Sequence, residues 1–152
     1  MTATTTQFSI FMIDKPGALA RIINAIADAK INLVALTIVD AKEHGVLRLV
    51  ARSAERLRSV LNKLNVPSHE TQVLTVELSN RTGALAIVVA KLAEAKVNID
   101  YAYVTASAAG GKTTGVLKGN ELARAQKLLA GKTKDIEKRT TVKGRSVRTG
   151  GR

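Results

Sequence analysis

The sequence contains one segment twice, and this repeat limits the possible folds more than any other feature. Residues 14–33, DKPGALARIINAIADAKINL, lie over residues 80–99, NRTGALAIVVAKLAEAKVNI, with a shift of 66 positions, no gap and eight identities. A second match pairs residues 45–47 with residues 115–117 after a slightly longer loop. Internal repeats indicate repeated structural units. We therefore expect two homologous units, each able to form its own small sheet.

Hydrophobic periodicity predicts a strand, a helix, two strands and a second helix in the first unit. Residues 8–13 form an apolar run rich in strand-forming residues. The next apolar residues have helical spacing and predict a helix that buries Leu19, Ile22, Ile23 and Ile26. Strands are expected at residues 31–39 and 46–52. Ser53 is then expected to cap a second helix, whose inward face carries Leu57, Val60, Leu61 and Leu64.

The second unit repeats this order. Residues 71–78 contain neither Gly nor Pro, which predicts one long strand that closes the first sheet and opens the second. A helix is expected over residues 83–95, with an inward face of Leu85, Val88, Val89 and Leu92. Strands are expected at residues 97–105 and 113–118. Asn120 is expected to cap a last helix that carries Leu122, Leu128 and Leu129.

If the helices cover one face of each sheet, the other face also needs a cover. The strands at residues 8–13 and 33–39 are apolar on both sides, as is typical of strands buried on both faces. Either the two units pack on each other or two chains pack sheet to sheet. We favour a homodimer.

Composition excludes several classes of protein. The chain has no Cys and two His, so it offers no disulfide, no thiolate nucleophile and no cysteine- or histidine-rich metal site. Acidic residues are scattered without an apolar pair for acid-base chemistry. No apolar run reaches the ~18 residues of a membrane span, and residues 1–10 lack the layout of a signal peptide. We expect a cytoplasmic protein without cofactor, metal, membrane contact or catalytic residues.

The net charge of +12 is unevenly distributed. Residues 132–152 contain eight basic and two acidic residues, so these 21 positions carry half of the net positive charge. The same segment has three large apolar residues. Such a segment buries too little surface to offset its ordering entropy. We expect units at residues 1–72 and 73–142, followed by a basic tail at residues 143–152 that is largely unpacked.

Two loops are candidate binding sites because each links a strand to the start of a helix. They are residues 14–19, DKPGAL, and residues 80–85, NRTGAL. Free backbone N–H groups at a helix start suit an anion such as a carboxylate, and glycine permits close approach to the backbone. The alternative is a plain helix start in which Asp14 or Asn80 is a polar turn residue.

Two other features have structural alternatives. Asn32 and Asn98 follow their helices at equal offset, and the simpler interpretation is that they end those helices in a turn. Residues 106–113, ASAAGGKT, loosely fit a phosphate-binding loop, which requires a following helix. The β-branched residues after this segment favour a hairpin instead.

The repeated segments resemble the ACT domain, a regulatory ligand-binding module. The resemblance lies in an apolar strand, DKPGALA, an apolar helix and AKINL, and in NRTGALA and AKVNI of the second copy. It covers residues 7 to about 130, and the arrangement is similar to small tandem ACT proteins without a catalytic domain. The resemblance implies an α+β fold of two tandem ferredoxin-like βαββαβ units, with antiparallel sheets and helices on one face. It places the last strand near residues 135–142, where the sequence is a poor strand.

The resemblance also implies amino acid binding where two units lie side by side. In members that bind serine, the loop reads His-x-Asn-x-Pro-Gly-x-Leu, and its Asn corresponds to Asn80 here and to Asp14 in the first unit. The family's later Asn corresponds to Asn32 and Asn98. Met12 and Leu78 occupy the position of the His, which suggests a more apolar pocket.

These observations lead to the hypothesis of a non-enzymatic amino acid-binding sensor or regulatory protein. Its expected partners are a free amino acid, a second copy of the chain and a regulated enzyme or other protein. The expected ligand-binding residues are Asp14, Gly17, Ala18, Leu19, Asn32, Asn80, Gly83, Ala84, Leu85 and Asn98. The alternative is a nucleic-acid-binding module that uses the basic surface and tail. RNA-recognition domains of this fold need aromatic residues on both central strands, and residues 46–52 contain none.

Overall fold

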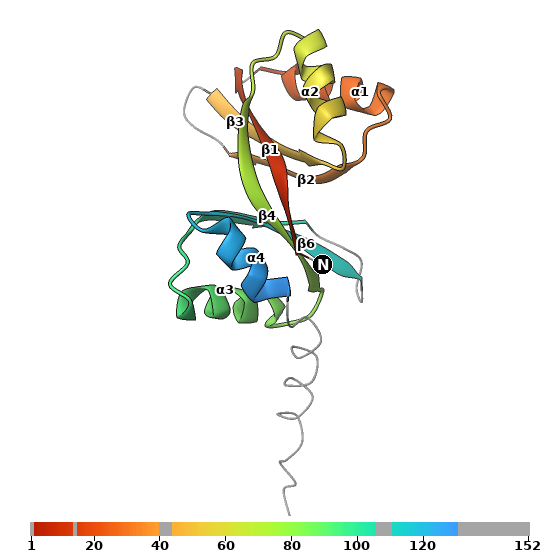
Figure 1. The fold of residues 1–152 in the computed structure, drawn as a ribbon. Coiled ribbons are helices and arrows are strands. Elements are labelled where there is room, and N and C mark those ends of the chain that lie inside the picture. The colour runs from red at the N-terminus through yellow and green to blue at the C-terminus, as the bar shows by residue number, and fades with distance from the viewer. Residues whose placement is uncertain (1, 14, 40–43, 106–110, 131–152) are drawn as a thin grey trace, which may run out of the picture.

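The computed structural model describes residues 2–13, 15–39, 44–105 and 111–130. These residues form two lobes joined by one continuous antiparallel sheet (Figure 1), in which the strands lie in the order β2-β3-β1-β4-β6-β5. The elements are β1 (Thr2–Ile13), α1 (Ala18–Asp28), β2 (Leu33–Val39), β3 (His44–Ala51), α2 (Ala54–Lys63), β4 (His69–Ser79), α3 (Ala84–Glu94), β5 (Ile99–Val104), β6 (Lys112–Gly119) and α4 (Leu122–Ala130).

The first lobe contains the predicted βαββαβ unit. Its strands follow the order β2-β3-β1-β4, with α1 and α2 on one face. Ser53 caps α2 as expected, since its side-chain oxygen accepts a hydrogen bond from the backbone N–H of Arg56 at 3.4 Å. Strand β1 is longer than predicted and begins at Thr2, because its threonine-rich first half pairs with β4. The predicted ferredoxin-like unit is thus confirmed.

Strand β4 belongs to both units, as the uninterrupted segment predicted. It pairs with β1 through residues 69–76 and with β6 through residues 74–79. In Figure 1, β1 and β4 run from one lobe into the other. One strand therefore closes the first sheet and opens the second.

Strand β1 is shared as well, which the sequence did not suggest. Its residues 2–6 lie beside β4 at the position of a fourth strand for the second unit, and α4 contacts them. Thr4 Oγ1 donates a hydrogen bond to Gln126 Oε1 on α4 at 3.0 Å. The strand expected near residues 135–142 lies outside the described residues, and the place beside β4 is filled by β1.

Each lobe has its own core between helices and sheet. Phe8, Ile22, Ile26, Leu47, Leu49, Leu57 and Leu61 are buried in the first lobe, and Leu74, Val88, Leu92, Leu117, Ala125 and Leu129 in the second. Three residues predicted to face inward are exposed: Leu85 by 39%, Val89 by 40% and Leu128 by 38%. Helix α3 is apolar around most of its circumference, so periodicity alone did not identify its buried side. On α4 the small Ala125 packs inward together with Leu129.

The sheet face without helices curls onto itself. Strands β2 and β6 make contact although they are not neighbours in the sheet. Ala35, Val50, Val73 and Val116 are buried there as a third apolar cluster. Packing of the two units on each other, one of the two arrangements considered for this face, therefore occurs within the chain. Phe11, Ile13 and Val39 remain 70%, 64% and 45% exposed.

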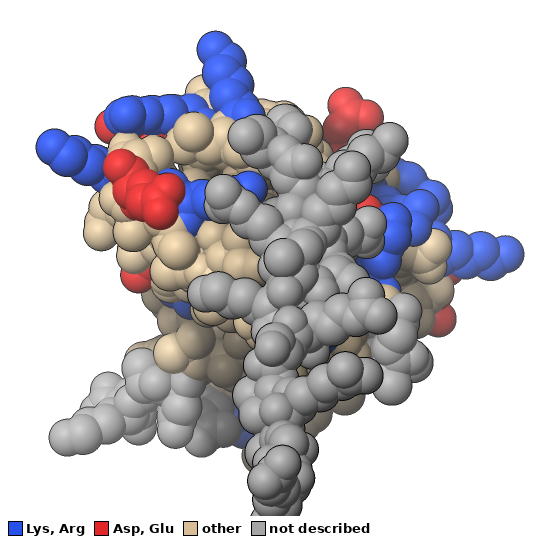
Figure 2. Space-filling view, turned by 90° about the horizontal axis from the view of Figure 1, so that it is seen from below, with Lys and Arg blue, Asp and Glu red and all other residues tan. Residues whose placement is uncertain are grey.

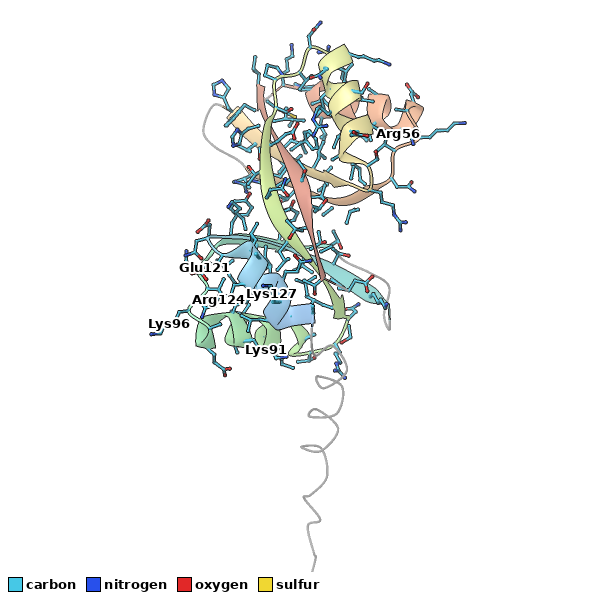
Figure 3. All side chains as sticks on the ribbon, viewed as in Figure 1. Arg56, Lys91, Lys96, Glu121, Arg124 and Lys127 are labelled. Carbon is cyan, nitrogen blue, oxygen red and sulfur yellow. The ribbon has the colours of Figure 1, made fainter. Side chains whose placement is uncertain are left out.

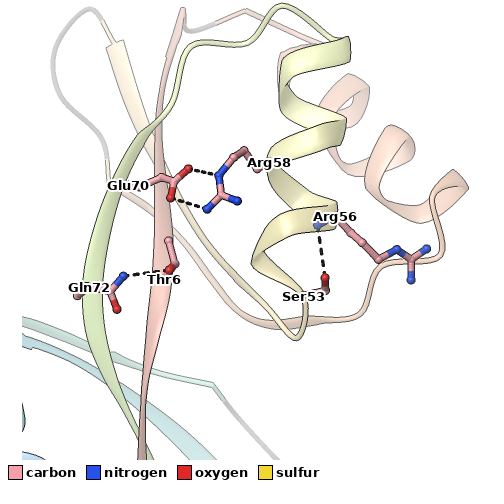
Figure 4. Close-up of polar contacts among 6 residues, drawn as sticks. All are labelled: Thr6, Ser53, Arg56, Arg58, Glu70 and Gln72. Carbon is pink, nitrogen blue, oxygen red and sulfur yellow. Dashed lines mark hydrogen bonds and ion pairs between the residues drawn. The ribbon is translucent and has the colours of Figure 1, made fainter.

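Polar contacts connect α2 to the sheet (Figure 4). Arg58 donates from Nε and Nη2 to the two carboxylate oxygens of Glu70, at 2.6 and 2.8 Å. This charge-assisted pair holds the pKa of Glu70 below its ordinary value and raises the pKa of Arg58. Beside it, Gln72 Nε2 donates to Thr6 Oγ1 at 3.0 Å across the β1–β4 pair. These contacts fix the start of β4 against the first lobe.

Candidate ligand sites

The two repeated loops have the same backbone geometry. Gly17 and Gly83 are the N-cap residues of α1 and α3, with φ and ψ of 88° and −14° and of 84° and −7°. These angles lie in the left-handed region, which favours glycine. A Cβ atom built at either glycine would meet no atom within 4 Å. The repeated glycines are therefore required by conformation, and each faces open space that a ligand could occupy.

A helix that begins on glycine has no N-cap side chain to accept from its first-turn N–H groups. The Gly17 carbonyl accepts from Arg21 N at 3.0 Å, and the Gly83 carbonyl accepts from Ile87 N at 3.1 Å, so both helices start regularly. Both glycines are exposed. The N–H groups of Ala18 and Ala84 donate to the carbonyls of Lys15 and Arg81 at 3.3 Å. The other first-turn amides and the positive end of the helix dipole at these points suit a carboxylate.

An open cavity of about 340 Å³ lies beside the first loop. Its lining consists of Met12, Ile13, Lys15, Ala18, Leu19, Ile38 and Gly45. Two predicted site residues, Ala18 and Leu19, therefore line it, together with Met12 at the position of the serine-binding histidine. Among the described residues of this lining, Lys15 has the one charged or polar side chain. Asp14 lies outside the described residues.

The second loop is arranged differently around its glycine. Ala84 is buried in the core of the second lobe, whereas Leu85 is exposed. The backbone N–H of Asn80 donates to the carbonyl of Gly111, which ties this loop to the start of β6. Of the predicted residues in this loop, Asn80, Gly83 and Leu85 are exposed, whereas Ala84 is part of the core.

The two asparagines lie at the opposite ends of the helices from the glycines. An 11-residue helix is about 16 Å long, so Gly17 and Asn32 of one unit cannot contact the same small ligand. The side chain of Asn98 donates to Asp100 Oδ1 at 3.0 Å, and Asn32 accepts from Arg52 N through its backbone carbonyl. A site that uses a loop and an asparagine must combine two units.

The interpretation of these asparagines as helix-ending residues is wrong. The residues in the left-handed conformation after α1 and α3 are Lys30 and Lys96, with φ of 53° and 57°. The next N–H bonds back into each helix, from Ile31 to Ile26 and from Val97 to Leu92. Asn32 and Asn98 follow these turns, and each directly precedes the first residue of a strand, β2 or β5.

Sequence reasoning missed a polar network on the helix-free face. Gln7 is fully buried, donates to the hydroxyl of Tyr101 at 2.7 Å and accepts from the hydroxyl of Tyr103 at 2.9 Å. Burial raises the pKa of Tyr103, so its hydroxyl stays protonated and can donate this hydrogen bond. The guanidinium carbon of Arg48 lies 4.1 Å from the centre of the Tyr101 ring. The available signals were a Gln beside Phe8 in an apolar strand and two tyrosines at strand spacing.

Basic side chains are spread over the surface. In the view of Figure 2 they flank the molecule on both sides, with acidic side chains beside them. Lys91, Lys96, Arg124 and Lys127 lie on or next to the helices of the second lobe (Figure 3), and Arg124 pairs with Glu121 at 3.0 Å. Within the described ranges, no three His, Cys, Asp or Glu side chains are grouped to hold a metal ion. None of the helices described is long and apolar enough to cross a membrane.

Two βαββαβ units that share β1 and β4 define a fused pair of ferredoxin-like modules. The antiparallel pairing of β5 with β6 also confirms the prediction of a hairpin there instead of a phosphate-binding loop. The chain belongs to the ACT domain pair family, whose model matches residues 3–142. No curated protein matches the sequence significantly.

Solved structures with this fold include the protein BT0572 of Bacteroides thetaiotaomicron. It is 26% identical with a TM-score of 0.76, and the match covers 85% of this chain and 88% of that one. The ligand-free regulatory subunit of aspartate kinase from Thermus thermophilus is 14% identical with a TM-score of 0.62, over 85% and 94% of the two chains. A structure of aspartokinase α and β subunits matches with 19% identity and a TM-score of 0.56, over 84% and 93%.

Proposed function

We propose that this chain is a non-enzymatic amino acid-binding sensor or regulatory protein of the cytoplasm. The observation that carries the proposal is the pair of left-handed glycines, Gly17 and Gly83, each opening a helix after the first strand of its unit in an ACT domain pair. Its structural similarity to a regulatory subunit of aspartate kinase supports a regulatory role. The regulated partner is then an enzyme or another protein.

In this proposal the ligand carboxylate accepts from backbone N–H groups near Gly17 to Leu19 or near Gly83 to Leu85. The α-amino group is held by Asn98 or Asn32 of a neighbouring unit, and Asp14 pairs with its charge. Met12, Leu19 and Ile38 make the cavity at the first loop apolar, which favours an amino acid with an apolar side chain. Because a loop and an asparagine of one unit are too far apart, each complete site needs two units.

A second copy of the chain would supply the neighbouring unit. Exposed Phe11, Ile13 and Val39 are apolar surface that a homodimer could cover. The dimer and the amino acid site are thus parts of the same proposal.

Calorimetric titration of the common amino acids against the full chain tests the proposal. We expect binding of at least one amino acid with an apolar side chain, lost in Gly17→Val or Gly83→Val. Absence of binding at millimolar concentration for all of them would refute it.

The competing function is nucleic acid binding, which the net charge of +12 favours. Removal of residues 132–152 discriminates between the two. If RNA or DNA binding disappears while amino acid binding persists, the basic tail is an accessory to a sensor. If the full chain binds nucleic acid but no amino acid, the competing function is correct.

A further inference from the structure

A second cavity, of about 320 Å³, lies on the helix-free face between the two halves of the curled sheet. It is separate from the loop cavity, since Phe11 lines this one and Met12, the next residue of β1, lines the other. Ser9, Phe11, Val46 and Arg48 line it from the first lobe, and Tyr101 and Lys118 from the second. A ligand here would contact both units of one chain.

Strand register explains how these side chains meet. Ser9 lies opposite Arg48 in the β1–β3 pair, and Tyr101 lies opposite Lys118 in the β5–β6 pair. The two pairs are far apart in the sheet order, but the curl of the sheet places Tyr101 against Gln7 of β1. Arg48 and Lys118 therefore approach the same tyrosine from different lobes.

The position of Arg48 is fixed before any ligand binds. Its guanidinium lies over the ring of Tyr101, and the hydroxyl of that tyrosine is held by the fully buried Gln7. The Nε atom of Arg48 is buried and has no hydrogen-bond partner among the residues that the structure describes. A buried donor without a partner is unfavourable, so the guanidinium has hydrogen-bonding capacity that the described residues leave unused.

The charges of the cavity favour an anion. Arg48 and Lys118 outnumber Asp100, the only acidic side chain in the described lining, whose carboxylate accepts a hydrogen bond from Asn98. The ammonium of Lys118 donates to the carbonyl of Gly119 at 3.1 Å, a bond that uses one of its three N–H groups. Phe11 and Val46 add an apolar wall. We propose that this cavity binds a small organic oxyanion, a carboxylate or a phosphate monoester with an apolar group, held by Arg48 and Lys118 so that the ligand bridges the two lobes.

The test is calorimetric titration of the full chain with three probes that share one apolar ring. Phenylacetate carries a carboxylate, phenyl phosphate carries a phosphate, and 2-phenylethanol is neutral. We expect one or both anions to bind and the alcohol to bind at least roughly tenfold more weakly, as loss of a charge-assisted contact implies. The stronger of the two anions identifies the ligand class.

Matched variants locate the binding. Lys118→Gln and Arg48→Gln should each weaken binding of the preferred anion by roughly ten- to a hundredfold. Lys127→Gln removes the same charge from the exposed surface of α4 and should leave the affinity unchanged. If Arg48→Gln fails to fold, the affinity of Lys118→Gln for the preferred anion still tests the proposal, because Lys118 is only half-buried.

Three outcomes would overturn the proposal: no binding of either anion at millimolar concentration, equal binding of the alcohol, or equal losses in Lys118→Gln and Lys127→Gln. Gly17→Val and Gly83→Val should bind the anions normally. Normal anion binding by these variants would show that the cavity is distinct from the loop sites. A finding that the loops bind no amino acid would therefore leave the present proposal intact.

Discussion

Thr4 on the first strand donates a hydrogen bond to Gln126 on the last described helix, across 122 positions of sequence. The bond marks the place where the start of the chain completes the second unit. Because β1 and β4 each belong to both units, neither unit has a complete sheet without the other's strand. The two units are therefore expected to unfold together.

The first prediction concerns this shared strand. Deletion of residues 1–6 removes the pairing of Thr2–Thr6 with Val76–Gln72 and uncovers α4. Several lost backbone hydrogen bonds, each worth about 1 kcal/mol, should lower Tm by roughly 10 °C. Hydrogen exchange should show α4 losing protection. Deletion of residues 143–152, the predicted unpacked tail, is the control and should leave Tm unchanged; equal effects of both deletions would contradict the shared strand.

The sequence predicted the fold well because the repeat and the periodicities are local signals. Eight identities at one offset placed two units, and the uninterrupted segment at residues 71–78 predicted a strand common to both. The sharing of β1 is a non-local pairing between residues 2–6 and β4, and threonines next to the N-terminus give no sign of it. The exposure of Val89 likewise depends on tertiary packing of a helix that is apolar on most sides.

The candidate sites were predicted unevenly for the same reason. A glycine at the start of a helix is visible in sequence, and both Gly17 and Gly83 have the conformation that requires it. The cavity with Arg48 and Lys118 depends on the curl of the sheet, which brings together strands that are not neighbours. No spacing in the sequence reports such a contact.

The second prediction concerns pH. Glu70 has a pKa lowered by Arg58, so the pair stabilises the folded chain above the ordinary Glu value near 4.5 and loses this effect as pH falls through the lower folded value. Glu70→Gln should therefore be less stable than the natural chain at pH 7 and close to it near pH 3. Urea denaturation at both values measures this. Both side chains are exposed by about 40%, so the difference should be small.

A double-mutant cycle is the control for this pair. Arg58→Gln should show the same pH dependence as Glu70→Gln, and the two together should cost less than their sum at pH 7. Additive costs at that pH would show that the two charges do not interact.

The third prediction separates strain from ligand approach at Gly83. A Val at φ of 84° is strained by about 1–2 kcal/mol or more because of its left-handed backbone conformation. A clash adds nothing to this strain, because no neighbouring atom lies within 4 Å of a Cβ atom at this position. Gly83→Val should lower Tm by a few degrees and abolish amino acid binding. Asn tolerates this conformation, so Gly83→Asn should keep Tm but weaken binding by filling the open space. Calorimetry and thermal melts measure both; natural affinity in Gly83→Asn would show that the ligand does not approach this glycine.

The fourth prediction is a homodimer at micromolar concentration. Part of the helix-free face is covered within the chain, but Phe11 and Val39 remain exposed. Both residues pair with Val46 of β3, so they lie in one row across β1, β3 and β2. Light scattering should give twice 16.2 kDa for the natural chain. Val39→Lys should shift it toward the monomer, since a charge in an apolar interface is costly. The monomer mass for the natural chain would contradict the prediction.

The last prediction assigns a role to Asn98. If Asn98 holds the α-amino group of the ligand, Asn98→Ala removes a charge-assisted hydrogen bond worth about 1.5–3 kcal/mol, and affinity should fall roughly tenfold to a hundredfold. In the structure its amide donates to Asp100, so the substitution also frees that carboxylate. Asn98 is exposed, and the melting temperature should therefore change little. Asn62→Ala, at another exposed asparagine, is the control for both measurements. A lower melting temperature with natural affinity would instead show that Asn98 supports the start of β5 and takes no part in binding.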